Sequence, residues 1–304
     1  MIKKNISCII PAYNEEKNIS KVLEVVTTYN NFFEIIIIDD ASKDNTYKII
    51  KKFQKQNNKI KIIKNNINLG KSGSIKKGIY KSKGTIIVML DADLVNLTHK
   101  NINSLIEPII AKKANQTILD RAGDRIPIWG WTNCAKYFGG ERSLLKKDFL
   151  DAKISSDGGY LLEINLNLHF IHREKIIRTI FCNNLYTIHQ YNKVSKIQGI
   201  KNYLKMSKQI VEKSGIYNFI KQIMYIEDSR YLPLYKIYKK YIYFRLLSGI
   251  IIVITNLIDG IFMSVWLNLK NIDIIPDKWA IAYQKRLTYL KNWYHNKKLY
   301  FKQR

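Results

Sequence analysis

Two closely spaced carboxylates, Asp91 and Asp93, directly follow the apolar run Thr85–Leu90. A pair of acids at the end of a buried strand costs desolvation free energy unless a cation lies between them. Carboxylate oxygens, completed by phosphate oxygens, are ligands that Mg²⁺ and Mn²⁺ prefer. The sequence therefore predicts a divalent metal site at Asp91 and Asp93, with Asp93 as the direct ligand.

Three further polar turns have a similar place relative to apolar, β-branched runs. They are Pro11–Glu16 after Ile6–Ile10, Asp39–Thr46 after Glu34–Ile38, and Asn68–Gly73 a few residues beyond Ile60–Ile63. Open α/β sheets bind ligands just outside the carboxyl ends of their strands. Any one of these turns is weak support, but the ordered set predicts an enzyme that binds a nucleotide diphosphate.

The first two turns are suited to holding a nucleoside. Pro11 stiffens the strand exit, and the backbone groups of Ala12 and Tyr13 are placed to meet a base. The carboxylates of Glu15 and Asp40 can accept hydrogen bonds from ribose or base, and the N3–H of uracil is the donor expected for Asp40. A local alternative stays open for Glu15, because an acid at a helix N-terminus is favourable in any protein.

The third turn is suited to a phosphate. Gly70 permits close approach of the backbone, and Lys71 offers a positive charge. An ordinary turn at the start of a helix would also explain this segment.

The positioning elements follow from periodicity. Apolar residues from Ile19 to Val26 recur at helical spacing, Asp44 is placed to cap a second helix, and Ser72–Ser82 predicts a third. Strands alternating with helices predict a mainly parallel sheet that is covered on both faces. Farther along, the pattern predicts a loop at Asp120–Gly130 and short helices at Ser143–Leu150 and Tyr160–Phe170.

These four turns together resemble family 2 glycosyltransferases, which use nucleotide-sugar donors on a GT-A fold. The resemblance is dense from Ile6 to Asp93 and thinner to Val211, and Ser72 departs from the glycine that many relatives carry. It implies a Rossmann-like domain at residues 1–213 and the use of Mg²⁺ or Mn²⁺. The later residues look most like the glucosyl-3-phosphoglycerate synthase and polyprenyl-phosphate glycosyltransferase branches.

The resemblance also implies roles downstream. In Gly139–Leu145, Glu141 would contact sugar or acceptor hydroxyls, and Arg142 would hold an acceptor phosphate as a fork. Glu163, the one acid of an apolar segment, would bind or activate the acceptor, and His189 would be a further metal ligand. Local ion pairs would explain Glu141, Arg142 and Glu163 equally simply, and an ordinary surface or core position would explain His189.

Composition favours some partners over others. The net charge is +27, but 42 of the 51 basic residues are Lys, scattered along the chain, which argues against a base-reading nucleic-acid protein. A solvated lysine-rich surface explains the charge, and attraction for anionic lipid or for a phosphorylated acceptor is the alternative. The start of the first strand close to Met1 predicts that the chain carries no signal peptide.

The region 214–304 is expected to be a mostly helical, apolar and basic tail. A basic amphipathic helix is predicted around Ile200–Lys213, just before it. Leu246–Leu269 is apolar apart from Asn256 and Asp259, so both a membrane-associated segment and a buried helix pair remain open.

The expected activity is metal-dependent transfer from a nucleotide sugar, with a UDP-sugar favoured, to a lipid phosphate or a small phosphorylated acceptor. The expected location is the cytoplasm, at the inner face of the cell membrane. The competing interpretation is a basic protein without turnover that binds RNA or anionic membrane. The sequence does not identify the sugar, the acceptor, the stereochemical outcome or the oligomeric state.

Overall fold

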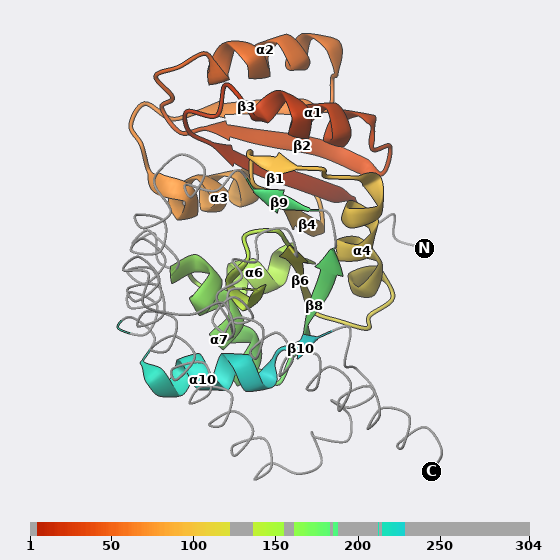
Figure 1. Cartoon of the computed structure of the whole chain (residues 1–304), viewed down its shortest axis with the longest axis vertical. Coiled ribbons are helices and arrows are strands. Elements are labelled where there is room, and N and C mark those ends of the chain that lie inside the picture. The colour runs from red at the N-terminus through yellow and green to blue at the C-terminus, as the bar shows by residue number, and fades with distance from the viewer. Residues whose placement is uncertain are drawn as a thin grey trace, which may run out of the picture.

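The computed structural model describes residues 5–121, 136–154, 161–182, 185–187, 212 and 215–228. Its centre is an eight-stranded sheet (Figure 1). From one edge to the other the strands are β10 (Glu227–Asp228), β8 (Ile177–Cys182), β6 (Gln116–Arg121), β7 (Arg142–Leu145), β4 (Ile86–Met89), β1 (Ile6–Ala12), β2 (Phe32–Asp39) and β3 (Ile60–Lys64). Neighbouring strands are parallel, except that β7 runs antiparallel to both β4 and β6.

Helices cover both faces of this sheet. One apolar cluster joins the strands to α1 (Ile19–Thr28), α2 (Thr46–Gln56) and α4 (His99–Ile110). A second cluster on the other face joins them to α3 (Gly70–Lys81), α6 (Lys146–Asp151) and α7 (Leu161–His172), and α10 (Ile216–Tyr225) packs on α7. A two-stranded antiparallel sheet pairs β5 (Leu94–Val95) with β9 (Tyr186–Thr187).

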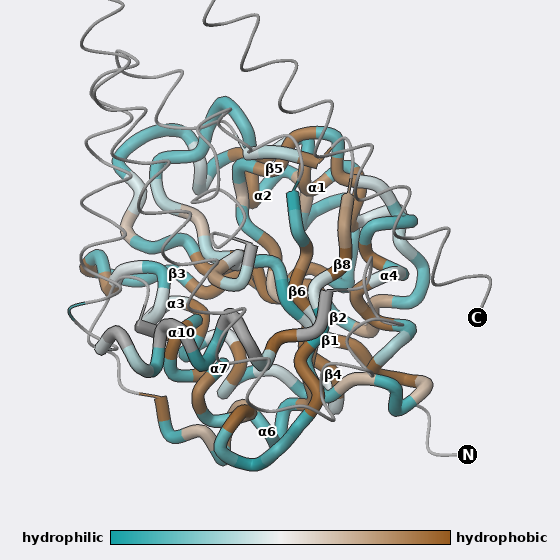
Figure 2. Tube along the Cα trace, turned by 60° about the horizontal axis from the view of Figure 1, so that its bottom comes forward, coloured by the Kyte–Doolittle hydropathy of each residue, from teal (hydrophilic) through white to brown (hydrophobic). Residues whose placement is uncertain are grey.

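The central strands are hydrophobic on both faces because helices cover both. All four residues of Ile35–Ile38 are at most 1% exposed, which is typical of a parallel sheet buried on both sides. In Figure 2 the inner strands are largely brown and many outer loops are teal. The expected mainly parallel sheet with flanking helices is therefore confirmed.

Three local expectations were wrong. Ser143–Leu145 is the end of β7 and not helix, because it pairs with β4 on one side while β7 pairs with β6 on the other, and tertiary pairing overrides local propensity. Asp120 and Arg121 end β6 and are not loop, because they pair with Phe181 and Cys182. Asn45 occupies the N-cap of α2, although Asp44 accepts a hydrogen bond from the Thr46 backbone N–H at 3.0 Å.

The expected mobile loop beyond Arg121 lies outside the described residues, as do the helix expected around Ile200–Lys213, apart from one residue, and the apolar segment Leu246–Leu269. Within the part of the chain that the structure describes, no helix is long and apolar enough to cross a membrane. The α10 and β10 segments pack against the rest of the fold. The domain boundary near residue 213 stays a prediction.

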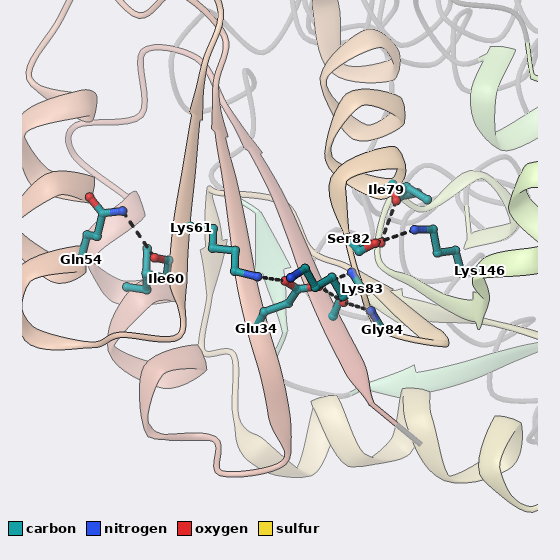
Figure 3. A network of polar contacts seen from close by, with 10 residues as sticks. Glu34, Gln54, Ile60, Lys61, Ile79, Ser82, Lys83, Gly84 and Lys146 are labelled. Atoms are coloured by element: carbon teal, nitrogen blue, oxygen red, sulfur yellow. Dashed lines mark hydrogen bonds and ion pairs between the residues drawn. The ribbon is translucent and has the colours of Figure 1, made fainter. Parts of the chain in front are cut away.

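A buried acid joins the strands at the edge of the sheet where they begin (Figure 3). Glu34 is 1% exposed and accepts hydrogen bonds from the Ser7 hydroxyl at 2.6 Å, the Lys83 backbone N–H at 2.5 Å and the Lys61 ammonium. Burial alone would raise the pKa of Glu34, but these donors outweigh it and lower the pKa. Each carboxylate oxygen is therefore satisfied, and the ionised form stabilises the fold.

We expect Glu34→Gln to destabilise the protein by about 1.5–3 kcal/mol at pH 7, because a charge-assisted network is replaced by weaker bonds. Since the folded pKa of Glu34 is lowered, its contribution is present above the unfolded value of 4.5 and is lost as pH falls through the folded value. Urea unfolding of both proteins at pH 7 and at pH 3 measures this. A stability difference that is as large at pH 3 as at pH 7 would contradict it.

Candidate functional site

Two of the predicted turns lie side by side at the carboxyl ends of β1 and β2, and they hold each other. The Asn14 backbone N–H donates to the Ser42 hydroxyl at 3.1 Å, and the Lys43 N–H donates to the Asn14 side chain at 2.8 Å. The next residue along the chain, Glu15, donates its backbone N–H to the Thr46 hydroxyl at 2.8 Å. These bonds fix the turn that contains Tyr13 and Glu15, directly after Pro11 and Ala12, which are the last two residues of β1.

Asp40 connects this turn to the segment before α3. Its backbone N–H donates to the Ala12 carbonyl at 2.8 Å, while its Oδ1 accepts from the Asn65 side chain and the Leu69 N–H, both at 2.8 Å. Its Oδ2 makes no hydrogen bond among the described residues. Gly70 follows with a φ of +73°, which explains a glycine there. Among the described residues, no atom lies within 4 Å of a Cβ placed at Gly70, so its positive φ and not crowding explains this glycine.

Charged side chains from five segments gather beyond the end of β4. The Lys71 ammonium on α3 lies 2.7 Å from Asp91 Oδ1 and 3.9 Å from Glu163 Oε1 on α7. Arg121, at the end of β6, lies 2.6 Å from Glu141 Oε1 and 3.9 Å from Asp91 Oδ2. We call Lys71, Asp91, Arg121, Glu141 and Glu163 the charge cluster. The fold thus joins residues that are up to 92 positions apart.

The backbone at Gly140 presses directly on this cluster. A Cβ built at Gly140 would lie 2.3 Å from Lys71 Nζ and 2.8 Å from Asp91 Oδ1. These distances are far inside van der Waals contact, so position 140 accepts only glycine while Lys71 and Asp91 stay in place. The turn before β7 therefore forms one wall of the site.

Three acids of the site have raised pKa values, whereas the charges of Lys71 and Arg121 outweigh burial at Asp91 and lower its pKa. Burial, then the charges of Asp91 and Glu15, raise the pKa of Asp93 to about 6. Burial raises the pKa of Glu141 to about 7 despite Arg121, and burial also raises that of Glu163 despite Lys71. Burial would lower the pKa of Lys71, but Asp91, Glu163 and Glu141 outweigh it and raise that pKa. Such clustered perturbations are typical of functional sites.

The predicted metal ligands fit a divalent cation in their chemistry. The charges that disfavour ionised Asp93 come from neighbouring carboxylates, and a cation beside Asp91 and Asp93 would reverse that repulsion. Among the described residues, no group of three or more His, Cys, Asp or Glu side chains is arranged to hold a metal ion. Oxygens from a bound phosphate would therefore have to complete the coordination.

His189 lies outside the described residues. Leu94, the neighbour of Asp93, pairs with Thr187 in β9. The chain thus passes close to Asp93 two residues before His189, whose role stays a prediction.

The structure places Arg142 inside the fold. Arg142 is 0% exposed, and each of its three guanidinium nitrogens donates to a protein acceptor. This burial argues against contact with an acceptor phosphate, and the predicted role of Arg142 stays a prediction. Arg121 was not predicted as a site residue, because its position in the sequence suggested a loop and only strand pairing carries it to Glu141 and Asp91.

Comparison with known proteins decides the family. The sequence pattern described as "Glycosyl transferase family 2" matches residues 7–162, just over half of the chain. The chain belongs to this family. The predicted family is thereby confirmed.

Several relatives within this family are dolichyl-phosphate glucosyltransferases. The human dolichyl-phosphate beta-glucosyltransferase is 35% identical over 101 residues, which cover 30% of this chain and 31% of that protein. The Dictyostelium discoideum enzyme of the same name is 38% identical over 99 residues, covering 29% of this chain and 30% of that protein. The match thus spans about a third of these relatives' length.

Solved structures agree with the fold. Glucosyl-3-phosphoglycerate synthase from Mycobacterium tuberculosis, in complex with Mn²⁺, uridine diphosphate and glucosyl-3-phosphoglycerate, matches with a TM-score of 0.55. The match has 17% identity and covers 70% of this chain and 81% of that one. At this identity the likeness concerns the fold, and it confirms the expected GT-A type.

We expect Asp93→Asn to stabilise the metal-free protein above pH 6. The pKa of Asp93 is about 6 when folded against 3.8 in the absence of its neighbours, so wild type loses stability as pH rises through this window. Asn does not ionise, so the variant keeps its stability over this pH range. After allowance for solvent screening, we expect its free energy of unfolding at pH 8 to exceed that of wild type by about 1–2 kcal/mol.

Urea unfolding in EDTA at pH 4 and pH 8 measures this difference, with Asp151→Asn on the exposed side of α6 as the control. An Asp93→Asn protein whose stability follows pH as wild type does would refute the assignment of the raised pKa to Asp93.

Proposed function

We propose that this protein is a glycosyltransferase that moves a sugar from a nucleotide diphosphate sugar, with a UDP-sugar favoured, to a phosphorylated acceptor. The observation that carries the proposal is the charge cluster beside Asp93, at the carboxyl ends of a parallel sheet in a family 2 chain. A basic protein without turnover would have no need for buried acids that lower its stability.

The donor's nucleoside would bind against the two locked turns. Backbone groups at Pro11, Ala12 and Tyr13, the Glu15 carboxylate and Oδ2 of Asp40 would meet base and ribose. The Asn65 and Leu69 bonds hold the Asp40 carboxylate in one orientation, so it would not need to be ordered when the donor binds.

The donor's diphosphate would lie between Gly70, Lys71 and the two acids Asp91 and Asp93. Asp91 and Asp93 would hold Mg²⁺ or Mn²⁺, which supplies charge stabilisation for the departing diphosphate. The Lys71 ammonium would exchange part of its contact with Asp91 for a phosphate oxygen, and so neutralise the same developing charge.

The acceptor would lie on the side of Glu141 and Glu163. An acceptor oxygen attacks the anomeric carbon, the bond from that carbon to the diphosphate oxygen breaks, and the acceptor proton must leave. Glu163 is 3% exposed with a raised pKa, so its carboxylate is suited to orient the attacking group or accept that proton. Glu141 would bind a sugar or acceptor hydroxyl through Oε2, which has no partner among the described residues.

Two acceptor classes are supported by different comparisons. The human and Dictyostelium relatives are named for dolichyl phosphate, which favours a lipid phosphate. With such an acceptor the protein would work at a membrane surface, and the inner face of the cell membrane remains our proposal. The Mycobacterium synthase has phosphoglycerate in its complexes, which favours a small phosphorylated acid. A lipid phosphate is our first choice, because the sequence similarity is with the lipid enzymes.

The proposal is tested by turnover with a panel of UDP-sugars and Mn²⁺, offered dolichyl phosphate and 3-phosphoglycerate in turn. We expect transfer to one acceptor, and loss of transfer in Asp93→Ala by at least about 10²-fold because a main metal anchor is gone. Asp151→Ala on α6 is the matched control and should behave as wild type. Near-normal turnover by a folded Asp93→Ala protein would exclude the metal-dependent mechanism.

A second variant separates the acceptor side from the donor side. Glu163→Gln keeps the shape of the side chain but removes its charge and basicity, so we expect transfer to fall by about 10²–10⁴-fold. The affinity for UDP and Mn²⁺, measured by calorimetry, should stay within a few fold of wild type. Glu107→Gln on the exposed side of α4 serves as the control. Full transfer by Glu163→Gln at saturating acceptor would reduce Glu163 to a structural residue.

A further inference from the structure

Arg142 is the largest fully buried side chain of the described structure, and it is positively charged. Its Nε donates to the Gly139 carbonyl at 2.7 Å and its Nη2 to the Tyr137 carbonyl at 3.0 Å. The Gly139 carbonyl lies in the turn between η2 (Lys136–Phe138) and β7, and the Tyr137 carbonyl lies in η2 itself. We refer to these residues together as the Tyr137–Gly140 turn. The guanidinium therefore holds this turn from inside the protein.

The far side of the same turn is the wall of the site. Gly139 packs closely on β6, because a Cβ placed at Gly139 would lie only 3.2 Å from the Leu119 carbonyl oxygen. Gly140 lies against Lys71 and Asp91, with no room for a side chain. A shift of the turn by even 1 Å would therefore change the space available to the Lys71 ammonium.

Hydrogen bonds between buried amide side chains connect Arg142 to the helices α7 and α10. Arg142 Nη1 donates to Asn167 Oδ1 on α7 at 2.7 Å, and Gln116 on β6 donates to the same oxygen at 3.0 Å. Asn167 Nδ2 donates in turn to the Tyr137 carbonyl at 2.9 Å and to Gln222 Oε1 on α10 at 3.1 Å. Arg142, Asn167 and Gln222 are all 0% exposed.

We propose that Arg142 is a positioning residue, which fixes Lys71 and Asp91 through the Tyr137–Gly140 turn. Asn167 and Gln222 extend this support to α7 and α10. The α10 segment, beyond the residues that match the family, thereby becomes part of what shapes the donor side of the site.

The hydrogen bonds of Arg142 are directed at the backbone of the turn and at Asn167. Arg142 makes no salt bridge among the described residues, so carbonyl and amide oxygens are its hydrogen-bond partners. Burial lowers its pKa to about 10, against the pull of Glu163 and Glu141, and the group stays charged at neutral pH. An apolar side chain at position 142 would remove the donor of the Gly139 carbonyl and one donor each of the Tyr137 carbonyl and Asn167, so the turn would have to move for these acceptors to find new partners.

The test uses the full chain with Arg142→Met and the milder Arg142→Lys, which keeps the charge but offers one nitrogen for three. Glu34→Gln is the matched control, because it disrupts a buried polar network near the amino ends of the strands, whereas the site lies at their carboxyl ends (Figure 3). The first readout needs no ligand. It is the rate of acetylation of Lys71 relative to the exposed Lys52, measured by mass spectrometry.

We expect Lys71 acetylation to rise by about tenfold in Arg142→Met, by less in Arg142→Lys, and to stay unchanged in Glu34→Gln. The second readout, which alone rests on the proposed function, is calorimetric affinity for UDP with Mn²⁺. That affinity should fall by about tenfold or more in Arg142→Met.

Unchanged Lys71 acetylation in either folded Arg142 variant would overturn the inference, as would an equal rise in the Glu34→Gln control. Should Arg142→Met not fold, the Arg142→Lys comparison decides alone. Wild-type protein that does not bind UDP with Mn²⁺ would count against the proposed donor, and the acetylation result would still decide whether Arg142 positions Lys71.

Discussion

The contact between Lys71 and Asp91 is the interaction around which the site is organised. It joins the start of α3 to the end of β4, the Gly140 backbone closes over it, and Glu163 lies 3.9 Å beyond Lys71. An ammonium that lies between carboxylates can exchange its contact with one of them for a contact with a phosphate oxygen. The free-energy cost is small, because the positive charge stays paired with a negative one. The arrangement is therefore suited to receive a diphosphate and a cation together, since acids outnumber bases around it.

The two buried acid networks of the sheet differ in what they do for the fold. At the edge where the strands begin, Glu34 is fully satisfied, its pKa is lowered, and its charge stabilises the folded state. At the other edge Asp93 and Glu141 have raised pKa values, so their ionised forms lower stability at neutral pH. A protein without use for such acids would be more stable with neutral residues there. This contrast supports a functional interpretation for the second edge.

The placement of the turns that carry the proposed donor site could be predicted from sequence because it depends on local geometry. Each motif follows its own strand, and parallel strands bring their carboxyl ends to one edge without further information. The positions of Arg121 and Arg142 could not be predicted in this way. Arg121 reaches Glu141 only because β6 pairs with β7 and β8, and Arg142 is buried only because β7 lies between β4 and β6. In isolation, Gly-Glu-Arg before a short apolar run equally suits a helix start with an exposed fork.

The difference between segments placed by local sequence and segments placed by tertiary contacts also concerns the proposed acceptor side. The family pattern ends at residue 162, one residue before Glu163, so most of α7 and all of β8 and α10 lie beyond it. These elements carry the proposed acceptor carboxylate, Asn167 and Gln222, and they join the site through Arg142 and the Tyr137–Gly140 turn. Membership of the family accordingly bears on the donor chemistry more directly than on the acceptor. Under the proposed function, the choice between a lipid phosphate and a small acid would depend on how α7 and its neighbours shape the space beside Glu163.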